Sequence, residues 1–214
     1  MARLPYLTQA DLKPEDQKLL ARDIALMRLM VHSPGATRAF QGLGGYIRNK
    51  STLDGRLREL AILQVGWLAR SPYEWSHHVK IGYDFGVSDA DIQALIDDTA
   101  GKATSFGAVE RCVLRAAREM TVEGAASDAT FKELQGYFST EHLTDLVVTI
   151  AFYCAVVRFL ATMAPNEKPM MWKRAPSGRM RVRPFATMAL TLSGVISGSS
   201  CIMSESPRPG ASAA

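Results

Sequence analysis

The pattern of hydrophobic and polar positions is helical, and its longest apolar runs predict a central pair of helices. The run from Leu60 to Ala69 contains one polar side chain, Gln64, and no proline, which is typical of a buried helix. Ser71 and Pro72 then supply an N-cap and a first helical residue, so a second helix is expected to begin there. Because the break is short, the two helices should be antiparallel, with facing side chains.

The rest of the chain shows the same start and stop signals: proline or a serine cap at helix starts, acidic residues in first turns, and Gly86 as a C-cap. The expected helices are residues 14–32, 34–49, 54–69, 71–86, 88–96, 108–122, 127–137 and 139–163. No period-2 strand pattern of useful length occurs, so the predicted fold class is all-α. Gly42, Gly44 and Gly45 interrupt the second helix; close helix packing is the favoured interpretation, and room for a ligand is the alternative.

The composition of the chain changes after Pro165. We expect residues 1–172 to form one helical domain and residues 173–214 to be a disordered tail, basic at first and then rich in Ser and Gly. The uncharged stretch 185–203 approaches the length of a membrane span, but its apolar density is low, so we do not expect a membrane partner. An arm that packs on a neighbouring subunit is a further alternative.

The positive net charge of the chain comes from the tail. The net charge is +4 and the pI is about 9.0, yet six basic residues and one acidic residue follow Trp172, so the domain itself is slightly acidic. The basic pI therefore gives no support to nucleic-acid binding. The three cysteines (Cys112, Cys154 and Cys201) are scattered, which favours buried thiols in a reducing compartment, and no secretory signal pattern begins the chain. We expect a cytoplasmic protein.

Candidate chemistry lies on the central pair of helices. Glu74 and His78 are i,i+4 neighbours on one face of the second helix. Glu59 opens the apolar first helix, where burial of a carboxylate costs free energy unless it is paired or protonated. If the three converge, they form a proton-transfer site, with Tyr73 and Trp75 as candidate ligand contacts.

Each of these residues also has a structural explanation. Glu59 and Arg56 could form an i,i+3 brace, and Glu74 and His78 a surface pair. Tyr73 and Trp75 could be core aromatic residues, and His77 is expected to face solvent. Glu74, His78 and Glu59 could also bind a metal ion, but no second histidine is placed to complete such a set. No phosphate loop, nucleophile elbow or dinucleotide fingerprint is present.

The order of these residues resembles a known family. Arg56-x-x-Glu59, then Tyr73-Glu74-Trp75-x-x-His78, then Gly86-Val87-Ser88 is similar to the carboxymuconolactone decarboxylase family, whose superfamily also holds alkylhydroperoxidase-D-like proteins. The resemblance spans roughly residues 10–165. It implies an all-helical, cofactor-free enzyme that assembles as homotrimers or homohexamers and acts on a small carboxylated lactone. It also implies catalytic roles for Glu59, Glu74 and His78.

The resemblance has a branch that this chain does not follow. Peroxidases of the superfamily carry a Cys-x-x-Cys pair, and the corresponding positions here are Ser71 and Glu74, so thiol peroxidase activity does not carry over. The expected function is therefore acid-base decarboxylation or proton transfer on a small organic acid, with no cofactor. The alternatives are an antioxidant protein and a non-catalytic oligomeric protein.

Overall fold

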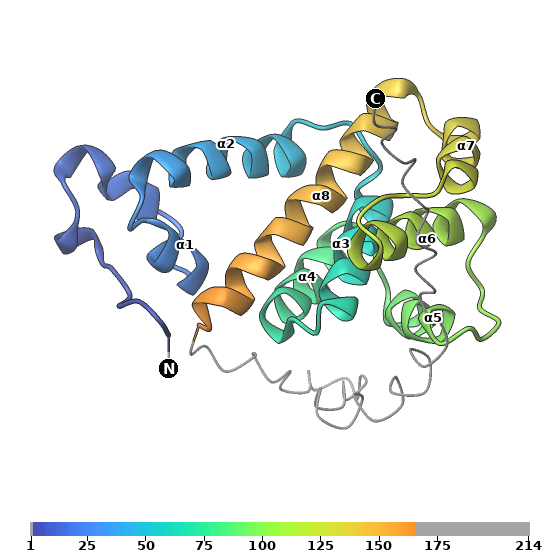
Figure 1. Ribbon diagram of the computed structural model, residues 1–214, viewed down its shortest axis with the longest axis horizontal. Helices are drawn as coiled ribbons and strands as arrows, with labels where there is room; N and C mark the ends of the chain where they lie inside the picture. Colours follow the sequence, from blue (N-terminus) through green and yellow to red (C-terminus); the bar gives the residue numbers. More distant parts are fainter. Residues whose placement is uncertain (1, 166–214) are drawn as a thin grey trace, which may run out of the picture. The chain divides into compact units, whose positions relative to one another are not determined.

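Helices account for every regular element in residues 2–165, the part of the chain that the computed structural model describes (Figure 1). The elements are η1 (Gln9–Asp11), η2 (Pro14–Leu20), α1 (Ala25–Met30), α2 (Pro34–Asn49), α3 (Gly55–Leu68), α4 (Pro72–Asp84), α5 (Asp89–Thr99), α6 (Ala108–Val122), α7 (Asp128–Tyr137) and α8 (Thr140–Met163). The predicted all-α class is thus confirmed. The expected domain boundary at residue 172 lies outside the described residues.

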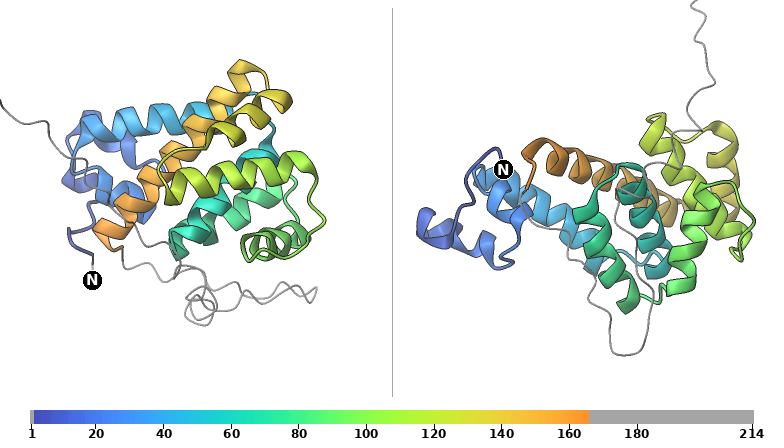
Figure 2. Two further views of the ribbon diagram at one scale, coloured as in Figure 1. Left: turned by 45° about the vertical axis from the view of Figure 1, so that its right-hand side comes forward. Right: turned by 90° about the horizontal axis from the view of Figure 1, so that it is seen from below.

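Helix α3 is the centre of the packing. It contacts α4, α6 and α8, and residues 58–67 are all buried. The two further views show α3 enclosed by these neighbours (Figure 2). A helix that is apolar on every side can bury all of its faces only in such a position, which explains the unbroken run from Leu60 to Val65.

Side-chain caps fix the helix starts that the sequence predicts. Asp54 accepts a hydrogen bond from the Leu57 amide at 2.8 Å, and Ser71 accepts one from the Glu74 amide. Serine caps also begin α5, α7 and α8. Such a cap stabilises a helix by about 1 kcal/mol. Gly86 has φ of +85°, so it ends the α4 segment in the left-handed region that glycine adopts without strain.

The predicted single helix over residues 14–32 is wrong. A 3-10 helix, η2, ends at Leu20, Ile24 is extended, and α1 begins only at Ala25. The amide of Leu26 is therefore outside the helical ladder and donates to the Tyr73 hydroxyl at 3.4 Å. This contact with α4 outweighs the helical period of the local sequence, and the resulting turn carries Arg22.

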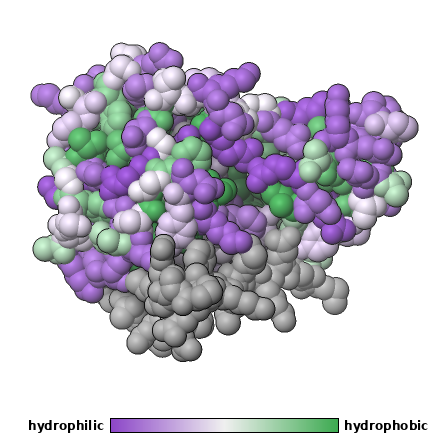
Figure 3. All heavy atoms as spheres, turned by 180° about the vertical axis from the view of Figure 1, so that it is seen from behind, coloured by the Kyte–Doolittle hydropathy of each residue, from purple (hydrophilic) through white to green (hydrophobic). Residues whose placement is uncertain are grey.

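Helix α8 packs along α3 and also reaches α6 and α2. By length and composition it is the one helix among the described residues that satisfies the criteria for crossing a membrane, but its packing is that of a core helix. Where α8 meets α2, a Cβ at Gly44 would lie 3.3 Å from the Phe152 ring, whereas Gly42 and Gly45 have open space. Close packing on Phe152 is thus one reason for Gly44, which also lines the cavity described below. The face in Figure 3 is mostly hydrophilic, with small hydrophobic areas between polar residues.

Candidate active site

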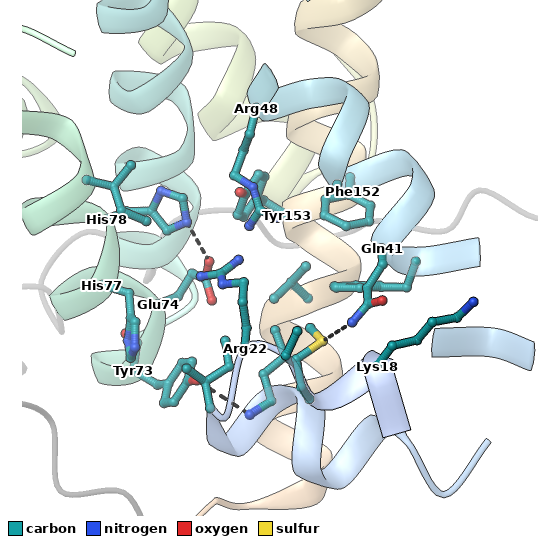
Figure 4. Close-up of a pocket in the computed structure, with 18 residues that line it drawn as sticks. Lys18, Arg22, Gln41, Arg48, Tyr73, Glu74, His77, His78, Phe152 and Tyr153 are labelled. Atoms are coloured by element: carbon teal, nitrogen blue, oxygen red, sulfur yellow. Dashed lines mark hydrogen bonds and ion pairs between the residues drawn. The ribbon is translucent and has the colours of Figure 1, made fainter. Parts of the chain in front are cut away.

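The structure brings His78 between two carboxylates. Its Nδ1 lies 2.6 Å from Oε2 of Glu59 on α3, and its Nε2 lies 3.1 Å from Oε1 of Glu74, one turn earlier on α4. All three residues are buried. Both ring nitrogens are therefore engaged, as only a doubly protonated imidazole can be when both partners are ionised. Figure 4 shows the contact between His78 and Glu74.

The other carboxylate oxygen of Glu59 contacts a buried arginine, Arg58. Arg58 places Nε and Nη2 each 3.2 Å from Oε1 of Glu59, and its guanidinium stacks on the Phe85 ring at 4.2 Å. The brace between Arg56 and Glu59 that the sequence left open as an alternative does not form, because Arg56 instead pairs with Asp91 and Glu110. Adjacent helical residues usually diverge, so spacing gave no indication of an Arg58–Glu59 pair.

This arrangement favours the charged form of His78. Burial of the ring lowers its pKa, but the hydrogen bonds and charges of Glu59 and Glu74 outweigh burial and raise the pKa of His78 to about 9. The imidazole is therefore an imidazolium at neutral pH. A buried cation between two carboxylates can pass a proton to either of them without moving a heavy atom.

A cavity of about 240 Å³ opens beside this cluster. Glu74 and His78 line it, whereas Glu59 does not, so the two carboxylates differ in access to a ligand. The Phe40 and Phe152 rings, whose centroids are 4.6 Å apart, also line the cavity. The cavity suits one small molecule with an apolar part, since drug-sized pockets begin at roughly 300 Å³.

Three cationic side chains line the same cavity: Lys18, Arg22 and Arg48. Among the described residues that line the cavity, Glu74 is the one carboxylate, and it is already paired with His78. Burial, together with the charge of Arg22, lowers the pKa of Arg48. The cavity therefore carries an excess of positive charge, which sequence spacing had not indicated because these residues come from η2, the following turn and α2.

The predicted ligand contacts have different positions. Tyr73 lines the cavity, while Trp75 lies outside the lining and packs on Trp67, with ring centroids 5.1 Å apart. The expectation that His77 faces solvent is wrong, since His77 is half-buried, stacks on Tyr73 at 4.3 Å and lines the cavity.

Tyr153 on α8 is a member of the site that sequence reasoning missed. Its ring meets the His78 ring edge-on at 4.8 Å, and it lines the cavity. Burial, followed by the charges of Glu74 and Glu59, raises the pKa of Tyr153, so its hydroxyl stays protonated and can donate. Nothing in the local sequence separates Tyr153 from the other apolar residues of α8.

The metal alternative finds no support in the geometry. Among the described residues, no group of three or more His, Cys, Asp or Glu side chains is arranged to hold a metal ion. A His78 ring that is hydrogen-bonded through both nitrogens also has no lone pair to offer.

Comparisons with known proteins bear on the fold and on the segment that carries Glu59, Glu74 and His78. Residues 34–119 match the model of the carboxymuconolactone decarboxylase family. This range includes α3 and α4 and so holds Glu59, Glu74 and His78. No curated protein matches the chain.

Several solved structures share the fold. An uncharacterised peroxidase-related protein from Ralstonia eutropha JMP134, an alkylhydroperoxidase AhpD core, is 20% identical with a TM-score of 0.61, over 78% of this chain and 93% of that chain. A protein of unknown function from Agrobacterium tumefaciens, proposed as an antioxidant-defence protein AhpD, is 22% identical with a TM-score of 0.57, over 65% and 95%. A cysteine-to-alanine variant of the debrominase Bmp8, in complex with 2,3,4-tribromopyrrole, is 18% identical with a TM-score of 0.63, over 78% and 94%.

At these identities the solved structures establish the fold alone, and the family model matches the segment that carries the buried cluster. The resemblance expected from the sequence is therefore confirmed. Residues 34–119 match the model of the carboxymuconolactone decarboxylase family, and the all-helical fold is similar to that of the AhpD-like structures.

Proposed function

We propose that this protein is a carboxymuconolactone decarboxylase-like enzyme, a lyase that transfers a proton on a small carboxylated lactone or a related organic acid. One observation carries the proposal: a buried His78 joins Glu74, which borders the cavity, to Glu59, which does not. Such an asymmetric relay has one end for the ligand and one end that keeps the imidazole charged and oriented.

The relay supplies what decarboxylation needs. Loss of carbon dioxide from the ligand leaves an electron pair delocalised as a dienolate, which must take up a proton at carbon. In this mechanism the His78 Nε2–H proton passes to Glu74, and Glu74 delivers it to that carbon. His78 becomes neutral and keeps the proton on Nδ1, which donates a hydrogen bond to Glu59. Uptake of one proton from solvent then restores the starting state. The reaction consumes one proton and releases one carbon dioxide.

Other groups around the cavity support a negatively charged ligand. The Tyr153 hydroxyl is a candidate donor for the enolate oxygen, since it lines the cavity beside His78 and its raised pKa keeps it protonated. Lys18, Arg22 and Arg48 give the lining its positive charge. Isomerisation of the same kind of acid needs the same proton transfer, so the relay also suits that reaction.

The deciding experiment compares turnover and folding in one pair of variants. Glu74→Gln keeps the shape and an acceptor for His78 Nε2 but cannot carry a proton. On a panel of carboxylated lactones and unsaturated dicarboxylates, turnover should fall on the order of 10²–10⁴-fold while the circular dichroism spectrum is retained. Glu141→Gln, an exposed residue at the start of α8, is the matched control and should behave as wild type. Normal turnover in folded Glu74→Gln would exclude the relay.

The peroxidase-related neighbours suggest an antioxidant function as the alternative. It is disfavoured because Ser71 and Glu74 occupy the two thiol positions of that branch. Cys112 contacts Thr130 and Arg115, and Cys154 contacts Thr121, so neither sulfur bonds to His78. The non-catalytic alternative predicts no turnover with any ligand and the same loss of thermal stability in each variant of the cluster.

A further inference from the structure

Two guanidinium groups line the cavity and have no side-chain partner within residues 2–165. Arg48 reaches in from the end of α2, and Arg22 from the turn before α1 (Figure 4). Among residues 2–165, neither forms an ion pair or a hydrogen bond through its side chain. They are close enough for the charge of Arg22 to act on Arg48. The charge of Arg22 disfavours the charged form of Arg48, and an anion bound between the two guanidinium groups would offset that cost.

The protein has suitable carboxylates but does not use them here. Asp16, on η2 beside Lys18, pairs with Arg38, and Glu74 pairs with His78. The charge of Glu74 still favours the charged form of Arg48, yet the two side chains form no ion pair. Arg48 is half-buried, so water screens its charge less than it would on an open surface.

We propose that Arg48 and Arg22 bind the acid group of the ligand and select small planar carboxylates over neutral molecules of the same shape. The assignment deepens the proposed function, on which it rests for the identity of the cavity as the active site. A guanidinium matches a carboxylate in plane and spacing, which makes paired hydrogen bonds the expected mode.

The remaining walls define the rest of the ligand. Phe40 and Phe152 offer apolar ring faces, and Glu74 with His78 lines the same cavity. A carboxylate held by Arg48 lies on the α2 side, so the body of the ligand extends between the rings and the proton-transfer groups. A volume of about 240 Å³ restricts that body to a single small ring or a short unsaturated chain.

Binding is measured by calorimetry on the full chain with benzoate, 2-furoate and cis,cis-muconate, each compared with the corresponding amide. At least one carboxylate should bind at least 10-fold more tightly than its amide. Arg48→Gln should weaken carboxylate binding by about 10- to 100-fold, the effect of losing charge-assisted hydrogen bonds. Arg48→Lys keeps the positive charge but not the planar guanidinium, so its loss of carboxylate affinity should be smaller than that of Arg48→Gln. Lys50→Gln, exposed at the C-cap of the same helix and outside the lining, should change the dissociation constant less than twofold.

Folding is checked by the melting temperature. Because Arg48 has no side-chain partner and faces Arg22, Arg48→Gln should melt at or above the wild-type temperature. Arg22→Gln, in an exposed turn, gives a second variant that cannot unfold the core and should also weaken binding. Equal binding of every carboxylate and its amide, or unchanged binding in both arginine variants, would overturn the assignment. Carboxylate binding without turnover would instead overturn the proposed function and leave the arginine site intact.

Discussion

His78 and Glu59, 19 residues apart in the chain, meet through a 2.6 Å contact between Nδ1 and Oε2 in the interior of the protein. Glu59 belongs to the most buried helix and His78 to the next one, so the pair joins α3 to α4. Both side chains are almost inaccessible to solvent. Because a charged pair in such surroundings cannot exchange its partner for water, its protonation state affects stability as well as chemistry.

The first prediction concerns stability at alkaline pH. The pKa of His78 is raised from its ordinary value of 6.5 to about 9 in the folded state, so the folded protein binds a proton that the unfolded chain releases above about pH 6.5. The resulting stabilisation is fully present below pH 6.5 and is lost as pH rises through 9. Its size is on the order of 3 kcal/mol. Urea unfolding between pH 6 and 10 should show this loss in wild type.

The same urea unfolding series in two variants tests whether His78 causes this loss of stability. His78→Asn should remove the pH dependence between 6.5 and 9, whereas His32→Asn, an exposed histidine outside the cluster, should retain it. A wild-type stability that stays flat across this range would show that His78 is not held as a cation.

The second prediction concerns coupling within the cluster. Glu59→Gln, Glu74→Gln and His78→Asn should each lower turnover on the order of 10²–10⁴-fold, since His78 and Glu74 carry the proton and Glu59 keeps His78 charged and oriented. Double variants should lose much less than the product of the single losses, because residues that act as a unit are not additive. Kinetics of the three singles and the Glu59→Gln/Glu74→Gln double variant test this, and multiplicative losses would mean independent roles.

The third prediction concerns assembly, which we expect to be a homotrimer or homohexamer. Large apolar side chains remain exposed on the single chain, among them Leu43 and Tyr46 on α2 and Phe131 and Tyr137 on α7. An assembly would cover such side chains. Light scattering on the full chain at micromolar concentration should give a multimer, and a clean monomer would contradict the expectation.

The fourth prediction concerns the thiols. Dithiol peroxide reduction needs two neighbouring cysteines, one with a depressed pKa. Burial, together with the charge of Glu133, raises the pKa of Cys112, and Cys154 is buried against Thr121. Cys201 lies outside the described residues. Peroxide consumption with dithiothreitol should not exceed background, and a thiol-dependent rate that disappears in Cys112→Ser or Cys154→Ser would refute this.

The fifth prediction compares two neighbouring glycines in α2. Gly45→Ala gains helix propensity in open space, so its free energy of unfolding should rise by about 0.5–1 kcal/mol. Gly44→Ala gains the same propensity but pushes on Phe152, which lines the cavity. It should be less stabilised than Gly45→Ala and should bind small carboxylates more weakly. Identical unfolding and binding data for the two variants would show that Gly44 is not a packing position.

Much of the fold could be predicted because its signals are local. Asp54, Ser71 and Ser88 act within one helical turn, and their caps form where the sequence places them. The unbroken apolar run of α3 likewise predicts burial on all sides. The break after Leu20 could not be predicted in this way, because the contact that accompanies it comes from Tyr73, 47 residues away from Leu26.

In the candidate site, too, local signals could be predicted and long-range contacts could not. Glu59, Glu74 and His78 share short spacings on a helical pair, and the structure brings them together. Arg58 and Tyr153 were missed for different reasons: one sits next to Glu59 in a helix, where neighbours usually diverge, and the other comes from α8. The cationic lining depends on how residues 14–48 pack on α4 and α8, which no spacing rule expresses.

The two walls of the cavity come from separate stretches of the chain. The cations lie before residue 50, on η2, the following turn and α2, whereas Glu74, His78 and Tyr153 lie after it. In the proposed scheme, ligand recognition and proton transfer are therefore carried by separate parts of the chain. Substitutions confined to residues 18–48 can change which acid the protein accepts while the proton path on α3 and α4 stays intact. Relatives that keep the second wall and vary the first would then form a series with one reaction and many substrates.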